Sequence, residues 1–116
     1  MSIRIEHMDD TYYPYYIFAD VSGMLWPDDY KSNHEATDRI KAKLVEKGCK
    51  VAKVMRVPWS TTVKFEGYLT PAGYVGFDSE SGAFECHSRH REAVEYVRDV
   101  IVEMAAELDE HRAALR

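Results

Sequence analysis

An α+β domain with an antiparallel sheet is the fold class that the sequence predicts, and three observations lead to it. The last quarter of the chain, about residues 89–115, lacks glycine and proline and repeats apolar residues at helical spacing. Six short segments before it have the apolar patterns of strands. The turns between the later segments are too short for parallel crossovers. The expected order is ββαββββα, with a sheet of five or six strands and two helices packed on one face.

The first half of the chain supplies two strands, a helix and a third strand in this prediction. Residues 2–8 alternate apolar and polar side chains, which predicts a half-buried strand, and residues 15–21 are apolar on both faces, which predicts a central strand. Residues 22–31 are predicted as a loop. Ser32 and Glu35 have the spacing of a capping box, and Gly48 suits the residue that follows a helix end. We therefore expect a helix over residues 32–47, followed by a strand at 50–57.

Three further strands are expected at residues 62–69, 74–78 and 83–87. The first has the clearest alternation, and it predicts one set of side chains facing inward (Val63, Phe65, Gly67 and Leu69) and one facing outward (Lys64, Glu66 and Tyr68). The turn between the first two contains Pro71 and Gly73, and the last strand is expected to bury Phe84 and Cys86.

The C-terminal helix is the longest element that the sequence predicts. A helix of about 25 residues spans roughly 37 Å, which is longer than a domain of this size is wide. Its apolar stripe is broad in the first half and narrow after Leu108. We expect the first half to pack on the domain and the second half to pair with another copy. The expected homodimer interface consists of Ile101, Met104, Leu108, His111 and Leu115.

Composition limits the class of protein. A chain of 116 residues fits one domain, residues 1–116, with a core of its own. The net charge of −5 disfavours a general nucleic-acid-binding protein. The two cysteines, Cys49 and Cys86, make no disulfide framework, and neither a signal peptide nor a membrane-spanning segment is expected. These features predict a cytoplasmic protein with reduced thiols, in which Cys86 is buried and inert.

An aromatic tract in the acidic N-terminal segment is the first candidate for a contact surface. Tyrosine and tryptophan provide large contact areas at little entropic cost, and they are favoured at interface hot spots. The alternative is that alternate tyrosines of a central strand belong to the core. The residues predicted to bind a partner are Tyr12, Tyr13, Met24, Leu25, Trp26 and Tyr30.

The junction at residues 85–91 is the second candidate. A zinc site or a Cys–His nucleophile pair is disfavoured, because Cys86 and His87 are neighbours on a strand and face opposite sides. No metal or cofactor is therefore expected. A helix N-terminus can bind anions, and arginines there oppose the helix dipole unless an anion is near. This predicts an anion-binding site, although both arginines can instead pair with acidic groups of the domain. The site would consist of Ser88, Arg89, His90 and Arg91.

The function expected from these patterns is non-catalytic binding to a larger protein, as a small acidic inhibitor or adaptor. Inhibitors that phages direct at host defence nucleases have a similar size and charge, and such an inhibitor is one candidate on those two grounds alone. The alternative is a domain that binds a small ligand or an anion at the N-terminus of the last helix and on the open sheet face. No catalytic residues are predicted, because no triad, metal set or phosphate-binding loop can be assembled.

Overall fold

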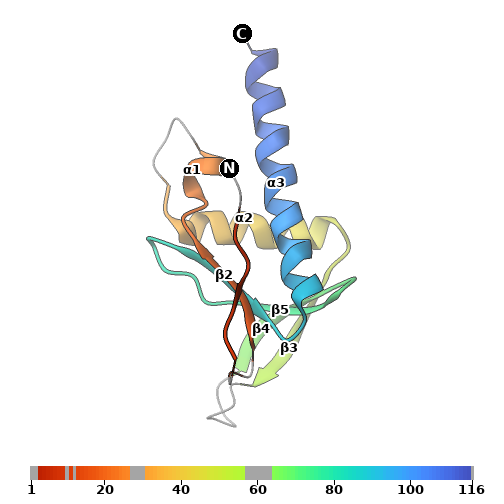
Figure 1. Ribbon diagram of the computed structural model, residues 1–116. Helices are drawn as coiled ribbons and strands as arrows, with labels where there is room; N and C mark the ends of the chain where they lie inside the picture. The colour runs from red at the N-terminus through yellow and green to blue at the C-terminus, as the bar shows by residue number, and fades with distance from the viewer. Residues whose placement is uncertain (1–2, 10, 12, 27–30, 57–63, 116) are drawn as a thin grey trace.

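The computed structural model describes residues 3–9, 11, 13–26, 31–56 and 64–115, and for 53–56, 64–66 and 112 it describes the backbone alone. The described elements form a sheet with helices beside it (Figure 1). In chain order they are β1 (Glu6–His7), β2 (Tyr15–Ala19), α1 (Ser22–Leu25), α2 (Asn33–Glu46), β3 (Lys50–Arg56), β4 (Lys64–Thr70), β5 (Gly73–Phe77), β6 (Phe84–Ser88) and α3 (Arg91–Ala114).

All of these strands belong to one antiparallel sheet in the order β1-β2-β6-β5-β4-β3. Strands β3 to β6 form a meander, and β6 then pairs with β2 along its whole length. This pairing joins the two halves of the chain and places β2 inside the sheet, as its apolar pattern predicted. The predicted α+β fold with an antiparallel sheet of five or six strands is confirmed, and the described sheet has six.

The long helices α2 and α3 cover the same face of this sheet, which confirms the predicted arrangement. Val97 and Ile101 of α3 are fully buried, as are Ile17 of β2 and Cys86 of β6, which pair with each other. Ile40, Leu44 and Ala36 extend this core along α2. The core therefore lies between the helices and the centre of the sheet.

Both predicted ends of α2 are confirmed. The Ser32 side chain accepts a hydrogen bond from the backbone N–H of Glu35 at 3.3 Å. Gly48 has a φ of 95°, a conformation that side chains disfavour. The N–H groups of Gly48 and Cys49 donate to the carbonyls of Val45 and Leu44, which satisfies the end of the helix.

The segment predicted as a loop after β2 contains the short helix α1. Asp20 Oδ1 accepts hydrogen bonds from the backbone N–H and the hydroxyl of Ser22, at 3.1 and 2.8 Å. Asn33 Nδ2 donates to the same oxygen at 3.1 Å, and Asn33 Oδ1 accepts from the Val21 N–H at 3.0 Å. Hydrogen bonds from Ser22 and Asn33 lower the pKa of the Asp20 carboxyl. The buried amide of Asn33 thus fixes α1 against the start of α2.

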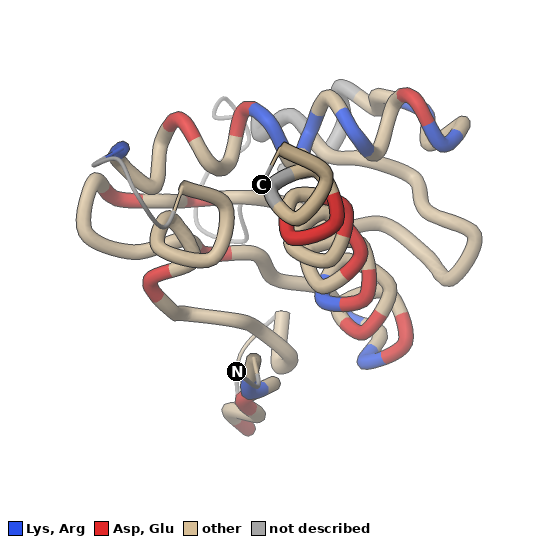
Figure 2. Tube along the Cα trace, turned by 90° about the horizontal axis from the view of Figure 1, so that it is seen from above, with Lys and Arg blue, Asp and Glu red and all other residues tan. Residues whose placement is uncertain are grey.

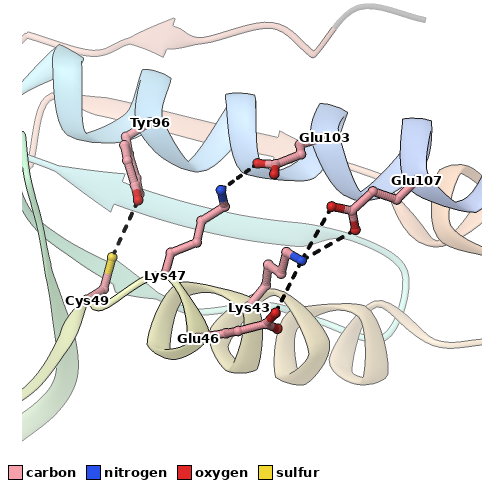
Figure 3. A network of polar contacts seen from close by, with 7 residues as sticks. All are labelled: Lys43, Glu46, Lys47, Cys49, Tyr96, Glu103 and Glu107. Carbon is pink, nitrogen blue, oxygen red and sulfur yellow. Dashed lines mark hydrogen bonds and ion pairs between the residues drawn. The ribbon is translucent and has the colours of Figure 1, made fainter.

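Charged side chains connect α2 to α3 along their exposed side (Figure 3). Lys47 Nζ lies 2.7 Å from Glu103 Oε2, and Lys43 Nζ lies 3.4 Å from Glu107 Oε2. The hydrogen bond between the first pair raises the pKa of Lys47 and lowers that of Glu103. Exposed pairs of this kind contribute little to stability because water screens them, so they orient the two helices more than they stabilise them.

The side-chain phase predicted for β4 was wrong where the structure describes it. Tyr68 is 5% exposed and faces the helices, whereas Leu69 is 37% exposed on the other face. Tyr68 packs edge-on against the Phe77 ring, with 5.6 Å between centroids. The prediction counted Tyr68 as a polar residue, but most of its side chain is an apolar ring whose burial is favourable. Val63 lies outside the described residues.

Helix α3 extends beyond the rest of the molecule at its C-terminal end (Figure 1). It has 24 residues, about 36 Å of helix, and the longest dimension of the molecule is 52 Å. The apolar residues on its core-facing side are buried as far as Met104, which confirms that the first half packs on the domain. Among the described residues, no helix is both long enough and apolar enough to span a membrane.

Truncating Val97 should destabilise the fold much more than truncating Val102 on the same helix. Val97 is fully buried and Val102 is 46% exposed. We expect Val97→Ala to lower the free energy of unfolding by about 2 kcal/mol and Val102→Ala to change it by less than about 0.5 kcal/mol. Urea denaturation followed by circular dichroism measures both. Equal losses in the two variants would contradict the packing described for α3.

Asp20 should contribute to the acid sensitivity of the fold. Its folded-state pKa is lowered, so its stabilising effect is complete above the pKa of the unfolded chain. That effect is lost as the pH falls through the lower, folded-state pKa. We therefore expect the stability of Asp20→Asn to fall less than that of the wild type between neutral and strongly acidic pH. Urea midpoints across this pH range test the prediction, and parallel curves would refute it.

Candidate functional site

The sheet face opposite α2 and α3 carries side chains that no described helix covers. The register places Tyr16 of β2 opposite His87 of β6, and His87 opposite Gly76 of β5. Phe18 lies opposite Glu85. Directly paired residues of antiparallel strands point to the same face, so these side chains form one continuous surface. We call it the uncovered face, and its named members are Tyr13, Tyr16, Phe18, Leu69, Tyr74, Glu85 and His87.

Large apolar and aromatic side chains on the uncovered face remain accessible to water. Phe18 is 54% exposed and Tyr74 is 47% exposed. Leu69, which pairs with Tyr74, is 37% exposed. Exposed aromatic side chains on one face of a small protein often indicate a contact surface.

A histidine–carboxylate pair lies among these aromatic residues. His87 Nδ1 is 2.7 Å from Glu85 Oε1 and 2.9 Å from Oε2, and both side chains are mostly buried. Since an ionised carboxylate only accepts hydrogen bonds, the contact places a proton on Nδ1 and fixes the orientation of the ring. The Tyr13 ring lies against His87, with 4.9 Å between centroids. The pair is a rigid polar centre within an aromatic surface.

The absence of a side chain at Gly76 makes room for the His87 ring. A Cβ atom added at Gly76 would lie 2.5 Å from His87 Nε2, well inside van der Waals contact. His87 therefore lies close against the backbone of β5. Gly76 pairs with Gly67 of β4, and both glycines are buried.

The residues predicted to bind a partner fall on two different sides of the molecule. Tyr13 belongs to the uncovered face, whereas Leu25 of α1 is 2% exposed and is part of the core, which corrects its assignment as a contact residue. Met24 and Trp26 are partly buried against that core. The Trp26 ring lies 5.6 Å from the Arg39 guanidinium. Tyr12 and Tyr30 lie outside the described residues.

The Ser88 hydroxyl of the predicted anion site is used in hydrogen bonds within the fold. Ser88 is fully buried, its Oγ donates to the Tyr74 carbonyl at 2.6 Å, and it accepts from the His90 N–H at 3.1 Å. Ser88 therefore anchors the start of α3 and is not available to a ligand. Arg91 lies 3.5 Å from Glu95, one turn along the helix. Arg89 and His90 are exposed.

The residues predicted to form the dimer interface differ in burial along the chain. Ile101 is fully buried and Met104 is 7% exposed in the core of the same chain, so neither is available to a second copy. Leu108 is half-buried, and His111 and Leu115 are exposed. Of the predicted dimer residues, those from Leu108 onward are therefore the ones with accessible surface.

The cysteines and acidic groups provide no evident reactive centre in the described ranges. Cys49 and Cys86 are unpaired and buried, and burial raises the pKa of the Cys86 thiol well above its ordinary value. The described residues contain no group of three potential metal ligands.

Sequence reasoning missed Phe18 and Tyr74 as surface residues, and although it named residues 85–91 as a candidate, it did not predict the contact between Glu85 and His87. Residues 15–21 were predicted as a central strand because they are apolar on both faces, which implies burial on both sides. The prediction that both helices share one face already implied that the other side of this strand lacks a helical cover. Combining these two predictions would have identified Tyr16 and Phe18 as candidates.

Comparisons of the chain with known protein families, with curated proteins and with solved structures gave no match.

Adding a methyl group at Gly76 should displace the His87 ring. We expect Gly76→Ala to destabilise the fold by about 1–2 kcal/mol, because a well-packed site has no space for the new atom. Gly82→Ala is the control, since nothing lies within 4 Å of the added Cβ. It should be neutral or slightly stabilising.

The clash can be assigned to His87 with a double-mutant cycle measured by urea denaturation. In a His87→Ala background, Gly76→Ala should cost much less than in the wild type, which gives a coupling energy of about 1 kcal/mol. If Gly76→Ala costs the same in both backgrounds, the close approach of His87 to β5 is not the cause.

Proposed function

We propose that the protein is a non-catalytic binding module, an inhibitor or adaptor, that contacts a larger protein through the uncovered face. The observation that supports this is the exposure of Phe18, Tyr74 and Leu69 on a side of the sheet that the described helices leave open. Burial of these side chains against a partner would remove them from water, which is favourable by about 25 cal/mol per Å² of apolar area.

The uncovered face contains residue types that are common at the centre of protein–protein interfaces. Aromatic residues are enriched at hot spots, because they bury a large area while losing few rotamers. The Glu85–His87 pair adds polar groups whose geometry is already fixed, so little ordering would be needed when a partner binds. An aromatic surface with a fixed polar pair suits a protein partner.

The charge of the protein favours a partner with a basic surface. The net charge is −5, and opposite potentials accelerate encounter and suppress wrong partners. Arginine or lysine side chains could stack on exposed aromatic rings such as Phe18 and Tyr74.

The buried thiols of Cys49 and Cys86 form no disulfide, which fits a reducing compartment, and we propose that the protein acts in the cytoplasm.

The proposal can be tested by placing a photo-reactive phenylalanine analogue at position 18 and, as a control, at position 45. Phe18 and Val45 are 54% and 50% exposed, but Val45 lies on α2. After irradiation in cells that produce the protein naturally, position 18 should form a discrete protein adduct that position 45 does not form. The adduct identifies the partner, which is then purified for binding measurements.

Binding of the purified partner should depend on the uncovered face. We expect Phe18→Ala to weaken binding about 30-fold, which corresponds to a hot-spot loss of about 2 kcal/mol. Val45→Ala should change the Kd by less than about twofold, and both variants should keep the wild-type melting temperature to within a few degrees. Isothermal titration calorimetry measures the affinities. Equal affinities of wild type and Phe18→Ala would contradict the proposal.

A further inference from the structure

A basic residue borders one end of the uncovered face. Lys50 of β3 pairs with Leu69 of β4, and Leu69 pairs with Tyr74 of β5. Directly paired residues point to the same face, so these three side chains form a row across three strands. All three are exposed, and Lys50 forms no ion pair with a described residue. We call this row the basic end.

A carboxylate borders the opposite end. Asp78 directly follows β5 and is exposed. Both of its neighbours face the helices, because Phe77 belongs to the core and the Thr37 hydroxyl of α2 donates to Ser79 Oγ at 2.6 Å. Since successive residues of an extended chain alternate, Asp78 points to the uncovered side. The Glu85 N–H donates to Ser79 Oγ at 3.0 Å, which keeps Asp78 close to Glu85.

Glu85 and Phe18 complete this second end. They pair across β6 and β2, so their side chains lie on the same face. Glu85 accepts the Nδ1–H of His87, and this hydrogen bond leaves the negative charge on the carboxylate as long as the imidazole is neutral. Asp78 forms no ion pair with a described residue. We call Phe18, Asp78 and Glu85 the acidic end.

The two ends are far enough apart to act separately. Lys50 and Tyr74 lie two strands apart in the sheet, and Asp78 is four residues further along the chain than Tyr74. At about 4.8 Å per strand and about 3.3 Å per residue, the backbones of Lys50 and Asp78 are roughly 16 Å apart. Salt screens exposed charges over about 8 Å at physiological ionic strength. Each end therefore presents its own charge to a partner, although the net charge of the protein is −5.

The charges on the helical side of the molecule are arranged differently. Residues of both signs recur along α2 and α3 (Figure 2), and some pair across the two helices, as Lys47 does with Glu103. A partner would have to compete with these pairs. Lys50 and Asp78 have no such pairs with described residues, so an oppositely charged group can approach either of them without breaking an ion pair that the structure shows.

We propose that the uncovered face binds a protein surface that carries an acidic and a basic side chain roughly 16 Å apart. The acidic side chain meets Lys50 at the basic end, and the basic side chain meets the carboxylates at the acidic end, where it can also stack on Phe18. The inference rests on the function proposed above and adds the orientation of the partner. Turning the partner around would bring like charges together at both ends, which is unfavourable.

Charge reversal at each end tests this inference with the partner captured through position 18. Lys50→Glu and Asp78→Lys should each weaken binding about tenfold, because each places like charges in contact. The matched controls are Arg39→Glu and Asp38→Lys, which change the net charge equally at exposed positions of α2. Each control should change the Kd by less than about twofold. Isothermal titration calorimetry measures all four affinities.

The two proposals fail in different ways. Unchanged affinity in Phe18→Ala would show that the uncovered face is not the contact surface, which contradicts both. If Phe18→Ala weakens binding while Lys50→Glu and Asp78→Lys behave like their controls, the face is the contact surface and the inferred charge pattern of the partner is wrong.

Cross-linking from both ends tests the orientation. A photo-reactive phenylalanine analogue at position 74 should attach to a partner segment that contains Asp or Glu, and at position 18 to one that contains Arg or Lys. Mass spectrometry of the adducts locates both segments. Replacing the partner's acidic residue with lysine should restore the affinity of Lys50→Glu to within about threefold of the wild-type complex. The opposite arrangement of the segments, or no rescue, would overturn the inference.

Discussion

The contact between the first half of α3 and the paired strands β2 and β6 is the interaction on which the rest of the structure depends. β2 comes early in the chain and β6 comes late, and both bury a fully enclosed residue, Ile17 and Cys86, under this helix. Val97 and Ile101 of α3 are fully buried in the same core cluster as these two residues. Because this packing joins distant segments, it fixes the strand order and holds α2 beside α3. The exposed ion pairs between the helices then orient a contact that apolar burial already stabilises.

In the part of the chain that the structure describes, the two long helices, α2 and α3, lie on one side of the sheet, and the other side has no helical cover. Side chains that alternate with the core residues, such as Phe18 beside Ile17 and His87 beside Cys86, consequently point away from the helices. The same strands therefore build the core and present the uncovered face. A rigid sheet is a suitable base for a binding surface, since partner contacts need little reorganisation of the protein.

Local chemistry made much of the fold predictable, and long-range contacts account for most of what was missed. The ends of α2 follow from Ser32 and Gly48, because caps act within a few residues. α1 depends on Asp20 and Asn33, which are thirteen positions apart, and no periodic pattern marks it. The stripe on α3 indicated burial, but it could not show that Ile101 and Met104 are covered by their own domain rather than by a partner. Tyr68 was assigned outward because the pattern of alternation does not show that the ring of Phe77 packs against it.

Hydroxyl-radical footprinting of the free protein tests the central claim most directly, because it compares the two faces of the sheet in one measurement. Phe18 and Tyr74 are about half exposed, whereas Phe84 is fully buried and Phe77 and Tyr68 are nearly so. After correction for the intrinsic reactivity of each residue type, the account predicts fast oxidation of the first pair and strong protection of the other three. Protection of Phe18 equal to that of Phe84 would show that the face is already covered, and the proposed contact surface would not exist.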